Sequence, residues 1–196
     1  NLNYYTEGIY GNLLNFNTQD LSQKNIIKIM NWGEQLYNNS FNNLLPVDLN
    51  NKKINIDYIV HKGQEDKFEW IVKNLNIRKK SRVLELGFGK LDLMKYIRDN
   101  TGAKVIGCNL SIEHVKEAKK NGFEAYQINH KHLKKYIDKL GQFDIIITNG
   151  TLEYLKNTDD KDNIYDDFIK NINKLLNKGG KWYTTTIHYN KNVCLN

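Results

Sequence analysis

Cysteine is scarce in this chain, and long apolar runs are missing from it. The 196 residues include only two cysteines, Cys108 and Cys194, which lie far apart and lack the spacing of metal ligands. We therefore expect no metal site. The longest apolar runs, such as residues 143–148, have the length of a strand and fall well short of the roughly 20 residues that span a bilayer. A transmembrane helix is not expected either.

The start of the chain also lacks the features of a secretory signal. Residues 1–10 contain no basic stretch followed by an apolar core. Three Asn-x-Ser/Thr triplets occur, at Asn38, Asn109 and Asn149, and the last two fall in loops that the motifs below assign to a cofactor. These observations predict a cytoplasmic protein that never meets glycosylation enzymes.

Arginine is rare, although the chain carries a formal charge of +7. The charge comes almost entirely from lysine, and guanidinium groups occur only at Arg78, Arg82 and Arg98. Abundant lysine, asparagine and isoleucine are typical of an AT-rich genome, and the lysines are dispersed among acids instead of forming one block. A surface for a polyanion such as nucleic acid is the less favoured interpretation of this charge.

From residue 57 onward, helix and strand patterns alternate. Strands are expected at 82–86, 104–108, 124–127, 143–148 and 181–188, with amphipathic helices before and between them. Ser111 is the expected N-cap of one helix, and Gly179-Gly180 is expected to stop the last one. Five such repeats predict an α/β fold with a doubly wound, mostly parallel sheet.

The first part of the chain differs from the rest. It is aromatic and rich in asparagine, with one helical pattern at 22–37. We expect residues 1–56 to form an arm or cap on a domain spanning 57–196. Aromatic side chains of the arm would roof a ligand pocket or pack the arm itself, namely Tyr4, Tyr5, Tyr10 and Trp32. The chain has no initiator Met and ends soon after the fifth strand, which predicts a C-terminally truncated fragment.

The most informative motif is Val-Leu-Glu-Leu-Gly-Phe-Gly at residues 83–89. A buried strand leads into Gly87 and Gly89, which let the backbone turn sharply and lie against a ligand. A dinucleotide site would need a third glycine three residues after Gly89, but Asp92 stands there and its carboxylate would repel a diphosphate. The motif therefore favours a cofactor without phosphates, of which S-adenosylmethionine is the common one.

This motif resembles the first motif of class I S-adenosylmethionine-dependent methyltransferases, whose order of elements residues 57–188 also follow. More narrowly, residues 101–111 are similar to the second-strand segment of cyclopropane-fatty-acid synthase-like methyltransferases. Further similarity lies in Phe143-Asp144-Ile145, the segment 150–154, the helix containing Tyr165, and Lys178-Gly179-Gly180. The resemblance implies a Rossmann-like fold that binds S-adenosylmethionine and methylates a lipid or small molecule.

The resemblance also implies which residues contact the cofactor. They are Glu85, Leu86, Gly87, Phe88, Gly89, Asn109, Leu110, Asn129, His130, Asn149 and Gly150. Glu85 would lie near the ammonium group, Asn109 near the ribose, and Asn129 with His130 near the adenine. Both asparagines stand where relatives often carry an acid, and Leu91 stands where many carry glycine. Neutral partners weaken such contacts, so a degenerate, non-catalytic structural or interaction module is the main alternative.

For the reaction, the resemblance implies a base in the loop after the fourth strand. Glu153 matches the glutamate that cyclopropane synthase-like relatives use around a bicarbonate, although a carboxylate there would also suit a helix N-terminus. Tyr154 stands where those relatives commonly have histidine, so cyclopropanation itself is doubtful. His188 is a candidate for the acceptor pocket. A nucleic-acid methyltransferase is disfavoured, because residues 149–152 are not an Asp/Asn-Pro-Pro-aromatic loop.

Overall fold

A computed structural model of the chain describes residues 56–156 and 163–186. The chain divides into two compact units, residues 1–71 and 72–196, and helix α3 (Ile56–Leu75) runs from the first into the second. The expected division into an arm and a domain at residue 56 stays a prediction. The predicted helix at 22–37 and the candidates Tyr4, Tyr5, Tyr10, Trp32 and His188 lie outside the described residues, as does Cys194.

The sheet of the second unit has five parallel strands in the order β3-β2-β1-β4-β5. The strands are β1 (Arg82–Leu86), β2 (Lys104–Asn109), β3 (Glu124–Gln127), β4 (Phe143–Asn149) and β5 (Leu176–Thr185). This order confirms the predicted Rossmann-like, doubly wound sheet. The chain moves outward from β1 to β2 and β3, and it then returns to β4 on the other side of β1. A crevice for a ligand is therefore expected at the carboxyl ends of β1 and β4.

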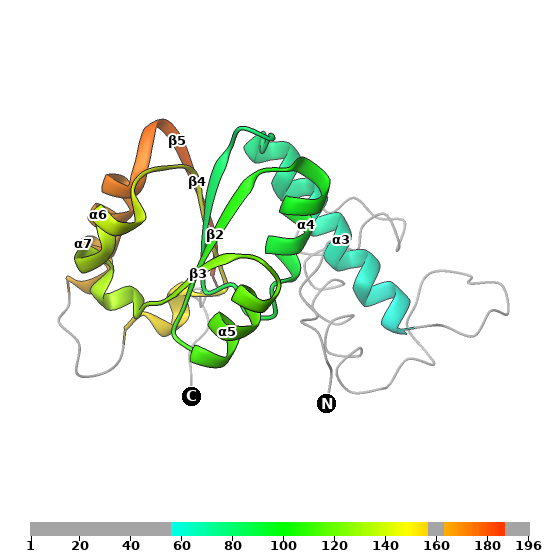
Figure 1. Cartoon of the computed structure of the whole chain (residues 1–196), viewed down its shortest axis with the longest axis horizontal. Coiled ribbons are helices and arrows are strands. Elements are labelled where there is room, and N and C mark those ends of the chain that lie inside the picture. The colour runs from blue at the N-terminus through cyan, green and yellow to red at the C-terminus, as the bar shows by residue number, and fades with distance from the viewer. Residues whose placement is uncertain (1–55, 157–162, 187–196) are drawn as a thin grey trace, which may run out of the picture. The chain divides into compact units, whose positions relative to one another are not determined.

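Helices cover both faces of this sheet, with α6 and α7 on one side and α4 on the other (Figure 1). Their bounds are α4 (Asp92–Thr101), α5 (Ile112–Lys120), the 3-10 helix η2 (His130–Tyr136), α6 (Ile137–Leu140), the 3-10 turn η3 (Leu152–Tyr154) and α7 (Ile164–Leu175). Ser111 caps α5 as predicted, because its hydroxyl accepts a hydrogen bond from the His114 N–H at 3.3 Å. None of the described helices is long and apolar enough to cross a membrane.

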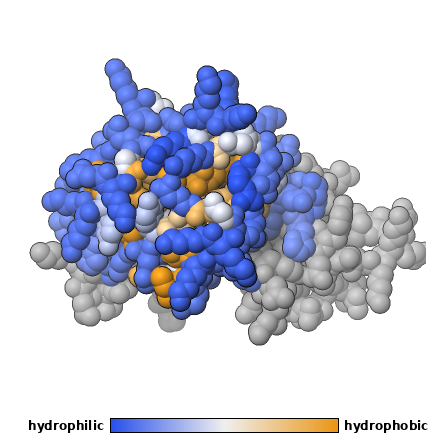
Figure 2. Space-filling model, viewed as in Figure 1, coloured by the Kyte–Doolittle hydropathy of each residue, from blue (hydrophilic) through white to orange (hydrophobic). Residues whose placement is uncertain are grey.

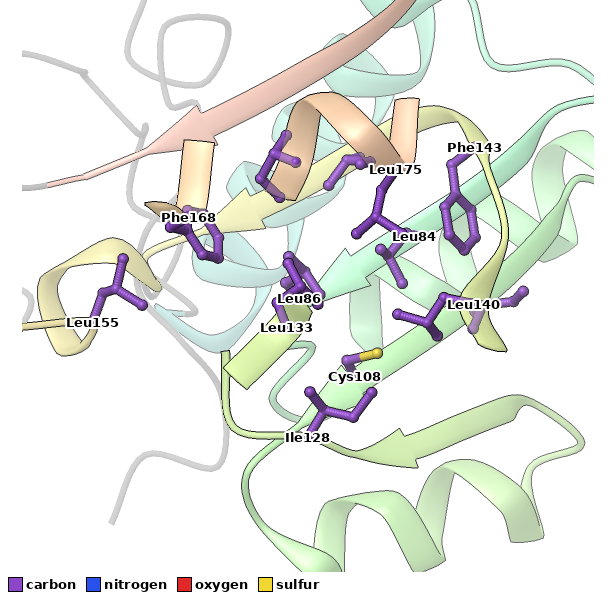
Figure 3. Packing of buried hydrophobic residues seen from close by; sticks show 13 residues of the cluster. Leu84, Leu86, Cys108, Ile128, Leu133, Leu140, Phe143, Leu155, Phe168 and Leu175 are labelled. Carbon is purple, nitrogen blue, oxygen red and sulfur yellow. The ribbon is translucent and has the colours of Figure 1, made fainter. Parts of the chain in front are cut away.

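The main core lies between the strands and the helices η2, α6 and α7. In Figure 3, Leu84 and Leu86 of β1 lie among side chains from these helices, including Leu133 and Phe168. Because side chains alternate along a strand, Glu85 belongs to the opposite face, beside its β2 neighbour Gly107. There a Cβ on Gly107 would lie within 3 Å of Phe88 and Met94, so glycine lets the motif loop and α4 pack closely on β2.

The predicted end of the last helix, at Gly179-Gly180, and the predicted start of the fifth strand, at residue 181, were both wrong. Helix α7 ends at Leu175, and β5 begins at once with Leu176, which pairs with Phe143. Gly179 and Gly180 therefore lie inside an irregular stretch of β5 and do not stop the helix. A Cβ on Gly180 would lie 3.1 Å from the carbonyl oxygen of Asp144, so this glycine permits close contact with β4.

The other difference concerns the helix predicted between the strands at 124–127 and 143–148, which the apolar residues Leu133, Tyr136, Ile137 and Leu140 indicate. The structure has a 3-10 helix from His130 to Tyr136, which is interrupted at His132, and a single α-turn after it. The apolar spacing found the buried residues Leu133 and Leu140 correctly but not the type of helix.

Candidate cofactor site at the carboxyl ends of the strands

The loop after β1 has the backbone that its glycines predict. Gly87 and Gly89 have φ angles of 84° and 52°, in the left-handed region that favours glycine. The Gly87 N–H donates to the carbonyl oxygen of Cys108 at 2.7 Å, which ties the loop to the end of β2. Leu91 also has a positive φ of 72°, although it is a leucine and only 1% exposed. Burial of its side chain therefore has to offset a strained backbone.

The loop after β4 lies directly against this turn. A Cβ on Gly87 would overlap the hydroxyl oxygen of Thr151 and lie 3.0 Å from its Cγ2. The Thr151 hydroxyl lies 3.0 Å from the carbonyl oxygen of Leu86 and donates to it. Glycine is thus required at position 87 for two reasons, its backbone angle and the threonine beside it.

Asn109 and Asn129 have the same local role at the ends of β2 and β3. Asn109 Oδ1 accepts a hydrogen bond from the Ser111 N–H at 2.9 Å, and Asn129 Oδ1 accepts one from the Lys131 N–H at 3.0 Å. Each asparagine therefore shapes the start of the following helix, which is a common use of this residue. Each amide oxygen can still accept a second hydrogen bond from a ligand.

His130 lies in surroundings that disfavour the charged form of its imidazole. Burial lowers the pKa of its imidazole, and a hydrogen bond to the backbone of Cys108 only partly opposes this effect. Its Nε2 atom is buried and has no hydrogen-bond partner within the described part of the chain. Cys108 is fully buried, and burial raises the pKa of its thiol to about 12. The thiol is therefore protonated and is no nucleophile.

The end of β4 is fastened to β5. The Thr185 hydroxyl donates to Asn149 Oδ1 at 2.7 Å and accepts a hydrogen bond from the Gly150 N–H at 3.0 Å. The amide oxygen of Asn149 is thus used within the protein. Its neighbour Thr148 is fully buried and accepts a hydrogen bond from the Trp182 indole at 3.0 Å.

Glu153 and Tyr154 follow in η3. Glu153 is half-buried, with its Oε2 atom completely inside the protein, whereas Tyr154 is 81% exposed. Leu110, after β2, is the other large apolar side chain of the predicted site that is strongly exposed, at 62%. On the face of the molecule that Figure 2 shows, hydrophobic areas interrupt a mostly hydrophilic surface.

The structure thus brings most of the predicted residues to one edge of the sheet. They follow or end β1 to β4, and the register pairs Leu86 with Cys108, and Asn109 with Gln127. Thr151 and Thr185 are the additions that sequence reasoning missed, since a loop threonine belongs to no motif. Within residues 56–156 and 163–186, no cluster of three or more His, Cys, Asp or Glu side chains could hold a metal ion.

Several proteins of known structure resemble this chain in fold. No curated protein sequence matches it. The cyclopropane synthase MmaA2 from Mycobacterium tuberculosis has a TM-score of 0.54 and 16% identity, covering 64% of this chain and 43% of that one. Geranyl diphosphate C-methyltransferase from Streptomyces coelicolor has a TM-score of 0.51 and 15% identity, with coverages of 66% and 49%. DesVI from Streptomyces venezuelae has a TM-score of 0.55 and 14% identity, with coverages of 73% and 62%.

These structural likenesses establish the fold alone, and the chain spans less than half the length of the first two proteins. The family is established by sequence. The model of the mycolic acid cyclopropane synthetase family matches residues 54–195. This match agrees with the resemblance that motifs 83–89, 101–111 and 150–154 predict. Because the matched residues make up most of the chain, the protein belongs to the mycolic acid cyclopropane synthetase family.

Proposed function

We propose that the protein binds S-adenosylmethionine at the carboxyl ends of β1 and β4 and transfers its methyl group to a lipid or small-molecule acceptor. The observation that carries the proposal is the Gly87–Gly89 turn, which lies at the strand-order reversal of a parallel sheet. Family membership supports it, as does the S-adenosylhomocysteine bound to the geranyl diphosphate C-methyltransferase of the same fold.

The methionine end of the cofactor would lie against the loop after β1. Gly87 and Gly89 carry no Cβ, so their backbone, with that of Leu86 and Phe88, can approach a ligand closely. Glu85 is 4% exposed and supplies a carboxylate near this turn. A carboxylate of low exposure favours a nearby cation, which suits the ammonium group of the methionine part. Asn149 and Gly150 would border the same end.

The nucleoside end would lie against the loops after β2 and β3. Asn109 is 9% exposed and would accept or donate one hydrogen bond at the ribose. The exposed Leu110 offers apolar surface to the adenine ring, and Asn129 and His130 would lie at its polar edge. These contacts are neutral, so we expect weaker binding than an acid at position 109 would give.

The reaction would need a base and an aligned acceptor. When bound, S-adenosylmethionine supplies an electrophilic methyl group on a sulfonium, and its in-line transfer depends mainly on alignment. Glu153, which is half-buried in η3, is the proposed base that takes a proton from the acceptor. Tyr154 and His188 are proposed to line the acceptor site.

A non-catalytic module is the second candidate, because one observation favours it. The amide oxygens of Asn109, Asn129 and Asn149 each accept a hydrogen bond within their own region of the protein. Hydrogen bonds of this kind are typical of loop residues in a purely structural domain. They explain the asparagines without a ligand.

Labelled methyl transfer distinguishes these functions. The protein would be incubated with S-adenosylmethionine labelled on its methyl group and with a fractionated cell extract. We expect label in the lipid or small-molecule fraction, and a large loss of it in Glu153→Gln. Cofactor binding with no label in any fraction would favour the non-catalytic module. Label in the nucleic-acid fraction would contradict a lipid or small-molecule acceptor. We expect the acceptor to come from the cytoplasmic fraction of the extract.

A further inference from the structure

A threonine hydroxyl fastens the loop after β4 to β1. Thr151 Oγ1 lies 3.0 Å from the carbonyl oxygen of Leu86 and 3.4 Å from that of Asn149. A hydroxyl has one proton, so it can donate to only one of these carbonyls at a time. The shorter distance favours Leu86, the last residue of β1. The hydroxyl therefore joins the loop after β4 to the end of β1, and these are the two strands at which the strand order reverses.

A second threonine fastens the same loop on its other side. Thr185, the last residue of β5, donates to Asn149 Oδ1 and accepts from the Gly150 N–H. Its carbonyl oxygen accepts from the same N–H at 3.1 Å. The residues Asn149 to Thr151 are thus held between β1 and β5 by two side-chain hydroxyls. We call Thr151 and Thr185 the threonine clamp.

The clamped loop carries both parts of the proposed site. On its β1 side, the Thr151 side chain fills the space beside Gly87. Glu153 follows two residues later, in the middle of η3. The Tyr154 N–H donates to the Thr151 carbonyl oxygen at 3.2 Å, which ties this turn to Thr151. A shift of Thr151 would therefore move the wall beside Gly87 and the proposed base together.

We propose that Thr151 is a positioning residue, whose hydroxyl holds the loop after β4 in the shape that receives the cofactor and aims Glu153. This inference rests on the proposed function. A loop that is ordered beforehand loses less conformational freedom when it binds, and small displacements of a catalytic group cost large factors in rate. A hydroxyl-to-carbonyl bond of this kind is expected to change affinity by roughly five- to tenfold.

The test compares Thr151→Val, which removes the hydroxyl and keeps the shape, with Thr151→Ser, which keeps the hydroxyl. Thr184→Val is the matched control, because Thr184 is an exposed residue of β5. Calorimetry measures the affinity for S-adenosylhomocysteine. We expect about a fivefold to tenfold loss in Thr151→Val, affinity within roughly twofold of wild type in Thr151→Ser, and no change in the control. Thr151→Ala replaces the valine variant should the latter not fold.

Hydrogen exchange supplies a readout that needs no cofactor. In Thr151→Val the amides of Gly150 and Tyr154 are expected to exchange faster, while those of β1 and β2 keep their rates. Unchanged exchange at these amides overturns the positioning role, whether or not the protein binds cofactor. An equal loss of affinity in the serine and valine variants overturns it as well. Failure of the wild type to bind S-adenosylhomocysteine, with the expected exchange pattern present, contradicts the proposed function instead.

Discussion

A side chain at position 87 would meet the side chain of Thr151, which comes from a loop 64 residues later in the chain. Gly122 provides the contrast. It has nearly the same φ, 82° against 84°, but nothing lies within 4 Å of where its Cβ would be. A substitution at Gly122 would cause backbone strain alone, whereas one at Gly87 would cause backbone strain and steric overlap.

Replacing each glycine by alanine should therefore cost different amounts. Gly122→Ala is expected to lower the free energy of unfolding by about 1 kcal/mol, through backbone strain alone. Gly87→Ala adds overlap with Thr151, for a total of about 3 kcal/mol. Thr151→Ala in the Gly87→Ala background should recover part of that cost. Urea unfolding measures all three, and equal losses for the two glycine variants would disprove the overlap.

Leu91 allows strain and burial to be weighed against each other. Leu91→Ala removes the buried side chain and keeps the positive φ, so we expect a loss of about 3 kcal/mol. Leu91→Gly removes the same side chain but relieves the backbone, so it should be the more stable variant by about 1 kcal/mol. Thermal or urea unfolding of the two proteins decides this. A glycine variant less stable than the alanine variant would mean that the backbone at position 91 is unstrained.

Asn109 allows a gain in affinity to be predicted. In Asn109→Asp the new carboxylate can still accept the Ser111 N–H and would add a charge-assisted hydrogen bond to the ribose. We expect binding of S-adenosylhomocysteine to tighten by roughly three- to tenfold. Asn173→Asp, at an exposed position of α7, is the control for the change in net charge. Weaker binding in Asn109→Asp would rule out a ribose contact at this position.

Asp144, at the start of β4, gives a pH-dependent prediction. The Arg82 backbone N–H, donating at 2.8 Å, holds the pKa of this carboxyl below its usual value, and the Asn177 side chain at 2.9 Å adds to the effect. A lowered pKa in the folded state stabilises the protein above the unfolded pKa of about 3.9. This stability is lost as the pH falls through the lower, folded pKa.

Asp144→Asn should therefore cost about 1 kcal/mol at pH 7, and the difference from wild type should shrink as the pH falls below the unfolded pKa of about 3.9. Asp138→Asn, on the exposed surface of α6, should change stability by less than about 0.5 kcal/mol. Urea unfolding at several pH values measures the differences. A gap that stays constant between pH 7 and pH 3 would show that Asp144 is not held as the anion.

Most of the strands were predictable from the sequence for a clear reason. Buried parallel strands are continuous apolar runs, so β1, β2 and β4 stand out, and the glycines of 83–89 fix which strand comes first. The end of α7 was not predictable, because Gly179-Gly180 looks like a helix stop. Only the register of Leu176 against Phe143, set by distant residues, shows that the strand has already begun.

The candidate site also has a part that the sequence predicts and a part that only the tertiary structure shows. Local patterns predict that Gly87, Asn109 and Asn129 lie together, since they follow neighbouring strands. The roles of Thr151 and Thr185 depend on which carbonyl or amide lies across a loop from them, and that is settled by tertiary structure. The functions of the predicted site residues stay predictions, which ligand-binding measurements test.

The most direct test of the proposed site is a calorimetric titration of S-adenosylhomocysteine into the wild type, Gly87→Ala and Gly122→Ala. The two variants share a positive φ, but only Gly87 lies at the proposed cofactor turn. We predict measurable binding by the wild type and by folded Gly122→Ala, and binding weakened at least roughly tenfold in Gly87→Ala. No binding by the wild type at millimolar ligand, or equal binding by both variants, would contradict a cofactor site at Gly87.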